Sequence, residues 1–150
     1  MEHGITFVKN IAAILFAASV LLATSMVRAE EQLIAVVVNA ESGITTISAK
    51  QVRRAYLGAS IVLNGIEVKP LLNETDKLAS EVFMQRIMFM SAEAYERQLI
   101  SRSFRGGSRP KVYENFPALL TALHKDNAAI TFMLYQTAIN TPGIRIISKL

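Results

Sequence analysis

An unbroken aliphatic run, Leu33 to Val38, most limits what this 150-residue chain can fold into. The run is rich in β-branched residues and lacks the apolar and polar alternation of a strand with one face in water. Such a run is typical of a central strand covered on both faces in a parallel sheet. After a polar stretch, Ser48 begins a helical pattern that ends at Gly58. Strand, loop and helix in this order predict an α/β fold.

The first 29 residues carry the pattern of a secretory signal. Lys9 precedes an uncharged apolar run at 11–23, and residues 27–29 place small side chains where a signal peptidase cleaves. The run is shorter than an ordinary membrane-spanning helix, and an uncleaved anchor is the alternative. We therefore predict a cleaved signal peptide at 1–29 and one exported domain at 30–150.

Further helices and short strands alternate along the rest of the chain. The turn Asn64-Gly65 precedes a predicted strand at 66–72, whose Pro70 favours a place at or near a sheet edge. Two more strands are predicted at 129–134 and 144–147. Helices are predicted to begin at Thr75 or Asp76, at Ser91 and at Asn115, with Leu78, Val82, Phe83, Ile87, Met88, Tyr95, Leu99, Leu119, Leu120 and Leu123 facing inward. The predicted architecture is an α/β three-layer sandwich with a mixed, mostly parallel sheet.

Residue types exclude several kinds of chemistry. The chain has no cysteine, which rules out disulfides, thiolate metal sites and a cysteine nucleophile. It has two histidines, His3 and His124, and no metal-ligand spacing, nucleophile elbow or phosphate-binding glycine loop. We therefore expect neither an enzyme nor a cofactor or metal site. The net charge of +4 comes from dispersed basic residues, so nucleic acid is not an expected partner.

A basic loop is predicted between the second and third of these helices, at 103–110. Flexible glycine backbone lets N–H groups approach an anion, while guanidinium groups bind carboxylate or phosphate oxygens. The alternative is an exposed turn with solvated arginines. The predicted anion-binding residues of this loop are Arg105, Gly106, Gly107, Ser108 and Arg109.

A second candidate anion site is the segment 73–77, where the N–H groups of a helix start could face an anion. Thr75 supplies a hydroxyl and Lys77 a positive charge. Glu74 and Asp76 oppose anion binding here, because their carboxylates would occupy or repel the place of the anion.

The order of several segments resembles that of phosphate-type substrate-binding proteins of ABC transporters. These segments are Gln51–Gly58 (QVRRAYLG), Asn64–Pro70 (NGIEVKP) and Phe89–Leu99 (FMSAEAYERQL), and 104–106 resembles a glycine-containing motif of small single-domain relatives. The resemblance covers nearly all of residues 33–148. It implies one lobe of a type II periplasmic-binding-protein-like fold at 30–150, located in the periplasm.

This chain differs from the resembled family at the residues that bind phosphate. In the family, an arginine is followed by Ser-Gly-Thr at a helix start, and these positions fall near Asn73 and on 77–79 here. None of the four keeps the family residue, and Leu78 and Ala79 offer no hydroxyl. Full-length members close two lobes on an oxyanion, whereas 30–150 supplies little more than one lobe.

Two functions remain open from the sequence. The first is an exported solute-binding-like domain that captures phosphate or another small anion for an ABC-type uptake system. The alternative is a noncatalytic interaction or sensory module that has lost the phosphate site. Its partner would be a membrane transporter, another envelope protein or a second copy of itself, and the candidate contact patch is Ile61, Val62 and Leu63.

Overall fold

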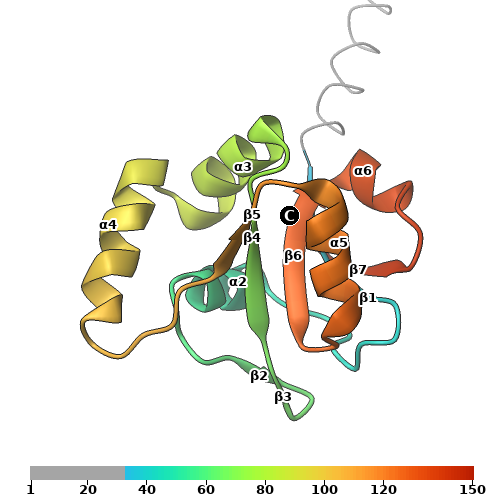
Figure 1. Ribbon diagram of the computed structural model, residues 1–150, viewed down its shortest axis with the longest axis horizontal. Helices are drawn as coiled ribbons and strands as arrows, with labels where there is room; N and C mark the ends of the chain where they lie inside the picture. The colour runs from blue at the N-terminus through green and yellow to red at the C-terminus, as the bar shows by residue number, and fades with distance from the viewer. Residues whose placement is uncertain (1–32) are drawn as a thin grey trace, which may run out of the picture. The chain divides into compact units, whose positions relative to one another are not determined.

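A computed structural model describes residues 33–150 as an α/β domain (Figure 1). The predicted signal peptide at 1–29 lies outside the described residues and stays a prediction. The strands are β1 (Ile34–Asn39), β2 (Val62–Leu63), β3 (Ile66–Glu67), β4 (Lys69–Asn73), β5 (Lys111–Tyr113), β6 (Ala129–Leu134) and β7 (Ile144–Lys149). The helices are α2 (Ala49–Tyr56), α3 (Lys77–Phe83), the π-helical turn η1 (Met84–Met88), α4 (Ala92–Ser103), α5 (Phe116–Lys125) and α6 (Tyr135–Ile139).

Five strands form one sheet in the order β5-β4-β6-β1-β7. Strand β4 pairs parallel with β5 and β6, whereas β1 pairs antiparallel with β6 and β7. Four strands therefore run in one direction and β1 runs against them, which confirms the mixed, mostly parallel sheet. The expectation of parallel neighbours for β1 is wrong. Its aliphatic run reflects burial on both faces, which helices above and below the sheet provide whatever the direction of the adjacent strands.

Side chains of β1 divide between two cores, one on each face of the sheet. All six residues of the strand are buried. Ile34, Val36 and Val38 pack with residues of α2, α3, η1 and α4, whereas Ala35 and Val37 pack with residues of α5 and α6. Because successive side chains of a strand point to opposite faces, the sheet lies between two helical layers. The predicted three-layer sandwich is confirmed.

Polar side chains begin the helices where the sequence predicts. Ser48 and Gln51 form a reciprocal capping box at α2, and Asp76 rather than Thr75 caps α3. Ser91 and Asn115 cap α4 and α5. Two of the predicted inward residues differ: Leu78, directly after the first residue of α3, is 43% exposed, and Leu120 is half-buried. The other predicted inward residues are buried: Val82, Phe83, Ile87, Met88, Tyr95, Leu99, Leu119 and Leu123.

The helix predicted to begin at Thr75 or Asp76 changes character halfway. Helix α3 ends at Phe83, and the π-helical turn η1 continues to Met88. Phe89 then has a left-handed backbone conformation with φ 55°. The turn redirects the chain toward α4 and leaves Phe89 on the surface, 69% exposed.

Local differences from the expected pattern occur at short elements. The strand predicted at 66–72 is divided at Val68 into the hairpin strand β3 and the sheet strand β4, because the Val68 N–H donates to the Ile61 carbonyl at 2.8 Å. Strand β5 and helix α6 were not predicted; they have only three and five residues. Within residues 33–150, no helix has the length and apolar character needed to cross a membrane.

Candidate functional site

Thr75 and Lys77, two of the predicted anion-binding residues, follow the carboxyl end of β4. The Thr75 hydroxyl and N–H both donate to the Asn73 side-chain oxygen, at 2.8 and 3.0 Å. The Asn73 amide group donates to the Phe132 carbonyl at 2.7 Å, so both polar atoms of this buried side chain have hydrogen-bond partners within the protein. Lys77 is exposed and lies 3.8 Å from Glu81 on the same helix.

A small crevice lies beside Thr75. It has a volume of about 220 Å³ and is lined by Asn73, Thr75, Asp76, Phe116, Met133 and Thr137. It is placed at the carboxyl ends of the adjacent parallel strands β4 and β6, whose following helices, α3 and α6, pack on opposite faces of the sheet. Open α/β sheets bind ligands at such points. Here, however, Asp76 accepts hydrogen bonds from the N–H groups of Leu78 and Ala79, so a carboxylate already occupies the start of α3.

The predicted glycine-arginine loop caps the end of α4 with its own backbone. The N–H groups of Arg105 and Gly107 donate to the Arg102 carbonyl at 2.9 and 3.0 Å, and that of Gly106 donates to the Ser103 carbonyl at 3.2 Å. These N–H groups are therefore turned toward the helix, and the loop offers an anion its side chains. The alternative of a solvent-exposed turn describes the backbone of this loop correctly.

The predicted site residues do not form one site. Strands β4 and β5 are parallel, with Leu71 opposite Lys111 and Asn73 opposite Tyr113. Thr75 and Lys77 follow the carboxyl end of β4, whereas the loop at 105–109 precedes the amino end of β5. The two groups therefore lie at opposite ends of this strand pair (Figure 1).

The loop itself is also divided between two surfaces. The Arg109 guanidinium donates to the Glu96 carboxylate, and Ser108 and Arg109 line a hollow of about 310 Å³ beside β4. Arg105 instead lines a larger groove between α2 and α4. Gly58 positions the loop, because a Cβ atom there would lie 2.5 Å from the Ser108 carbonyl oxygen.

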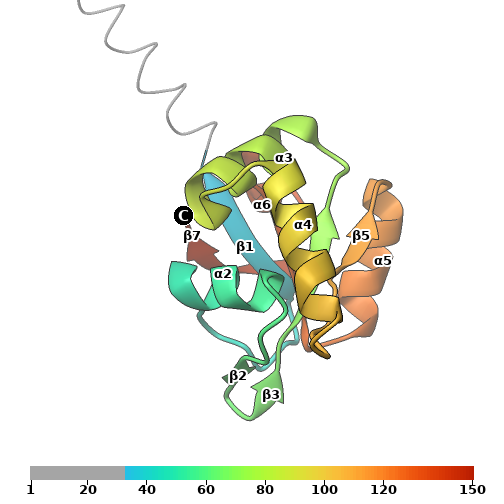
Figure 2. The same ribbon diagram turned by 90° about the vertical axis from the view of Figure 1, so that its left-hand side faces the viewer.

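Four arginines line this larger groove, which we call the arginine groove. It has a volume of about 710 Å³. Arg53 belongs to α2, Phe89 and Met90 lie between η1 and α4, and the other lining residues except Arg105 belong to α4. Figure 2 shows where α2 and α4 lie in the domain. Its lining residues are Arg53, Phe89, Met90, Ala94, Arg97, Gln98, Ser101, Arg102 and Arg105.

Positive charge in the arginine groove is largely uncompensated. Among residues 33–150, the salt bridges join Lys69 to Asp126, Lys77 to Glu81 and Arg109 to Glu96, and none engages an arginine of the groove. Glu93 lies one turn before Arg97 on α4. Hydrogen bonds from its own backbone N–H and from Ser91, together with the charge of Arg97, lower the pKa of Glu93. The lining of the groove contains four guanidinium groups and no carboxylate, so the groove attracts anions.

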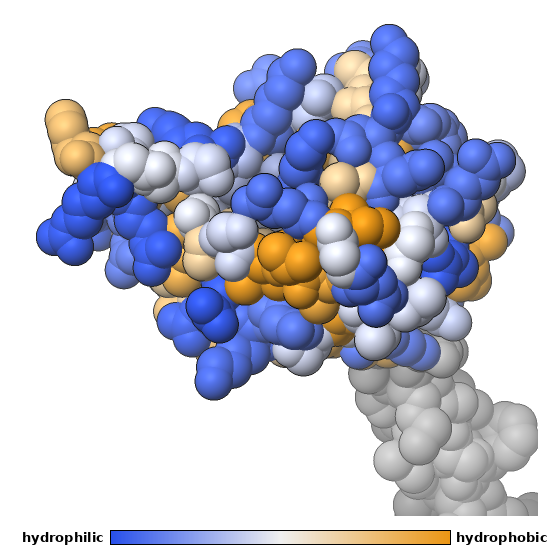
Figure 3. Space-filling view, turned by 90° about the horizontal axis from the view of Figure 1, so that it is seen from below, coloured by the Kyte–Doolittle hydropathy of each residue, from blue (hydrophilic) through white to orange (hydrophobic). Residues whose placement is uncertain are grey.

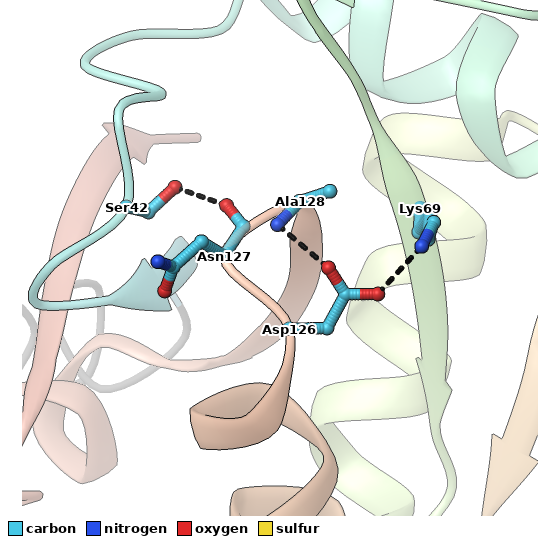
Figure 4. A network of polar contacts seen from close by, with 5 residues as sticks. All are labelled: Ser42, Lys69, Asp126, Asn127 and Ala128. Atoms are coloured by element: carbon cyan, nitrogen blue, oxygen red, sulfur yellow. Dashed lines mark hydrogen bonds and ion pairs between the residues drawn. The ribbon is translucent and has the colours of Figure 1, made fainter.

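A polar network between β4 and the start of β6 has a structural role. Asp126 accepts hydrogen bonds from the Lys69 ammonium at 2.8 Å and from the Ala128 N–H at 2.9 Å (Figure 4). Ser42 donates to the Asn127 carbonyl at 2.5 Å. These contacts place the first residue of β6 beside Lys69 of β4 in the parallel register. Within the described residues, no group of acidic side chains and histidines is arranged to hold a metal ion.

Comparisons with known proteins bear on the fold. No protein-family model and no curated protein matches the sequence. The structure is similar to an ABC-type phosphate transport receptor from Vibrio cholerae, with a TM-score of 0.52 and 12% sequence identity. The match covers 77% of this chain and 45% of the receptor, so the chain spans less than half of that protein. The predicted periplasmic-binding-protein-like α/β fold is confirmed by this similarity.

Sequence reasoning found one of the four arginines in the groove. Glycines follow Arg105 and mark it as a loop residue, whereas Arg53, Arg97 and Arg102 belong to no local motif. A helical projection supplies a partial signal: Ala94, Gln98, Ser101 and Arg102 are spaced by three or four residues and share one side of α4. The approach of Arg53 from α2 arises only from tertiary packing.

Proposed function

We propose that this protein is an exported, noncatalytic solute-binding-like domain that captures phosphate or another small anion for an ABC-type uptake system. The observation that carries the proposal is the convergence of Arg53, Arg97, Arg102 and Arg105 on one groove. Each guanidinium presents several donors in a planar fork that matches carboxylate and phosphate oxygens. An anion bound there neutralises charges that no salt bridge compensates among residues 33–150.

The arginine groove suits an anion better than the crevice beside Thr75 does. The crevice contains the Asp76 carboxylate, which already accepts the N–H groups at the start of α3. An anion placed beside it would meet a like charge at close range. Lys77 cannot offset this charge fully, because it lies near Glu81 and its side chain is 90% exposed. We therefore assign the anion to Arg105 and its neighbours rather than to Thr75 and Lys77.

Thermal unfolding with added anions tests this function. A ligand that binds only the folded state raises the melting temperature. We expect phosphate, sulfate or citrate at millimolar concentration to raise it, and sodium chloride to weaken the effect because exposed charges are screened. Arg53→Ala should reduce the shift. Arg54→Ala is the matched control, since Arg54 is the next residue of α2 and does not line the groove. No shift with any anion would overturn the proposal.

A second candidate function is a noncatalytic interaction module of the cell envelope. Val62, the first residue of β2 in the β2–β3 hairpin, is 61% exposed, with half-buried Leu63 and Ile66 beside it. Figure 3 looks onto the end of the domain that carries this hairpin and shows an apolar area among hydrophilic side chains. The predicted contribution of Ile61 to this patch is wrong, because Ile61 is 6% exposed.

Self-association gives a direct test of this second candidate. If the hairpin binds a second copy, sedimentation should show a dimer that Val62→Glu dissociates. Ile139→Glu is the control, because Ile139 is also exposed but belongs to α6. A monomer at every protein concentration would count against the homodimer and leave another envelope protein as the partner to seek.

A further inference from the structure

Phe89 is the part of the arginine groove that anion binding alone does not explain. The two residues before it, Ile87 and Met88, are 5% and 0% exposed, whereas Phe89 is 69% exposed. A large aromatic side chain gains stability when it is buried, so exposure of this ring runs against the packing of its neighbours. The ring lines the groove together with Met90.

The backbone of Phe89 is also unfavourable for a bulky residue. Its φ of 55° lies in the left-handed region, where glycine and asparagine are the usual residues. Two backbone hydrogen bonds stabilise this conformation, because the N–H groups of Phe89 and Met90 both donate to the Met84 carbonyl. Strained residues of this kind concentrate at ligand sites. The presence of phenylalanine at this position is therefore better explained by a role of its ring than by its backbone conformation.

The Phe89 ring lies beside a positive charge. The Arg53 guanidinium is 5.2 Å from the ring centroid, which is within the range of a cation–π contact. A planar group that enters the groove can contact both the ring and the guanidinium, as arginine and aromatic side chains both stack on flat ligands. The groove volume of about 710 Å³ is typical of sites for organic ligands and far exceeds the need of one oxyanion.

We infer that the arginine groove binds an aromatic acid, a small molecule in which a carboxylate or phosphate is attached to a planar ring. The acidic group is bound by Arg97, Arg102 and Arg105, and the ring packs on Phe89 beside Arg53. This inference rests on the proposed anion-binding function and specifies the chemical class of its ligand.

Calorimetric titration with phenyl phosphate and methyl phosphate tests the inference, because the two probes share one charged group and differ in the ring. Wild-type protein should bind phenyl phosphate about threefold to tenfold more tightly, as expected for one aromatic contact. Phe89→Leu should abolish this preference, because it weakens phenyl phosphate binding more than methyl phosphate binding. Phe104→Leu is the matched control, since Phe104 is 86% exposed and lies outside the groove lining.

The outcomes separate this inference from the proposed function. If the two probes bind equally and Phe89→Leu changes neither, the aromatic preference is overturned while anion binding stands. If neither probe binds, both are overturned. Should Phe89→Leu fail to fold, Phe89→Asn answers the same question, because asparagine tolerates a left-handed backbone and supplies no ring. Retained preference for phenyl phosphate in a folded Phe89→Asn protein contradicts the inference.

Discussion

The Arg53 guanidinium lies 5.2 Å from the centroid of the Phe89 ring. Arg53 belongs to α2, whereas Phe89 ends the π-helical turn η1, so this contact joins two elements that are distant in sequence. It crosses the groove that also contains Arg97, Arg102 and Arg105. The contact therefore connects the unusual backbone at Phe89 with the positive charge to which we assign ligand binding.

Replacing Phe89 should weaken ligand binding in the arginine groove without lowering the free energy of unfolding. Phe89→Asn relieves a left-handed strain of about 1–2 kcal/mol and removes a cation–π contact of about 0.5–1 kcal/mol. We therefore expect the free energy of unfolding to be unchanged or slightly raised, as measured by urea denaturation followed with far-ultraviolet circular dichroism. Phe104→Asn serves as the reference, because Phe104 has ordinary negative φ and high exposure. A loss of more than about 2 kcal/mol in Phe89→Asn would show that the ring supports the fold.

Glycine at position 58 is expected to be essential for the loop that carries Arg105. Gly58 has φ 81°, and a Cβ atom would approach the Ser108 carbonyl oxygen to 2.5 Å. Gly58→Ala should therefore destabilise the domain by more than the cost of about 1–2 kcal/mol that positive φ alone imposes. Gly65→Ala isolates that cost, since Gly65 has φ 78° and a Cβ atom there would lie more than 4 Å from every heavy atom outside its adjacent residues. Equal melting temperatures for the two variants would show that Ser108 moves away freely.

Stability at low pH should depend on the contact between Asp126 and Lys69. Hydrogen bonds from Lys69 and from the Ala128 N–H lower the pKa of Asp126 in the folded state. A lowered folded-state pKa stabilises the fold above the unfolded-state pKa, and this contribution is lost as the pH falls through the folded-state value. Unfolding free energies measured between about pH 5 and pH 2 should therefore decline less steeply in Asp126→Asn than in wild type. If the curves of unfolding free energy against pH are parallel for the two proteins, Asp126 does not contribute to the loss of stability at low pH.

Export is predicted to remove residues 1–29. Val27 and Ala29 supply the small side chains that precede the expected cleavage point, which lies after Ala29. Expression of the full chain in a Gram-negative host, followed by amino-terminal sequencing of the periplasmic fraction, should give a protein that begins at Glu30. Ala29→Arg should block cleavage, because a signal peptidase requires a small residue there. An unchanged amino terminus in membrane-bound wild-type protein would instead support the uncleaved anchor.

Local chemistry explains why the helices could be predicted from sequence. Ser48, Asp76, Ser91 and Asn115 each accept a hydrogen bond from a backbone N–H within three residues, so the signal and its structural effect are close in the chain. The direction of β1 could not be predicted in the same way. An aliphatic run indicates burial on both faces, and burial does not distinguish parallel from antiparallel partners.

The candidate site could be predicted only in part, for a related reason. Glycines mark Arg105 as a loop residue, but its neighbours in the groove come from α2, from α4 and from the chain after η1. The residues at 75–77 and 105–109 each have plausible anion-binding chemistry, yet the parallel pairing of β4 and β5 places them at opposite ends of the strands. Sequence reveals the type of chemistry, and the topology decides which residues share a surface.

Nuclear magnetic resonance of the arginine side chains tests the central claim most directly. Phosphate and phenyl phosphate should be titrated into labelled protein while the Nε–Hε resonances of Arg53, Arg97, Arg102 and Arg105 are followed, with each resonance assigned by single Arg→Lys variants. The account predicts saturable shifts of these resonances, weakened by salt, with Arg54 unaffected. Shifts confined to the backbone of residues 73–77, or no saturable shift at all, would contradict anion binding in the arginine groove.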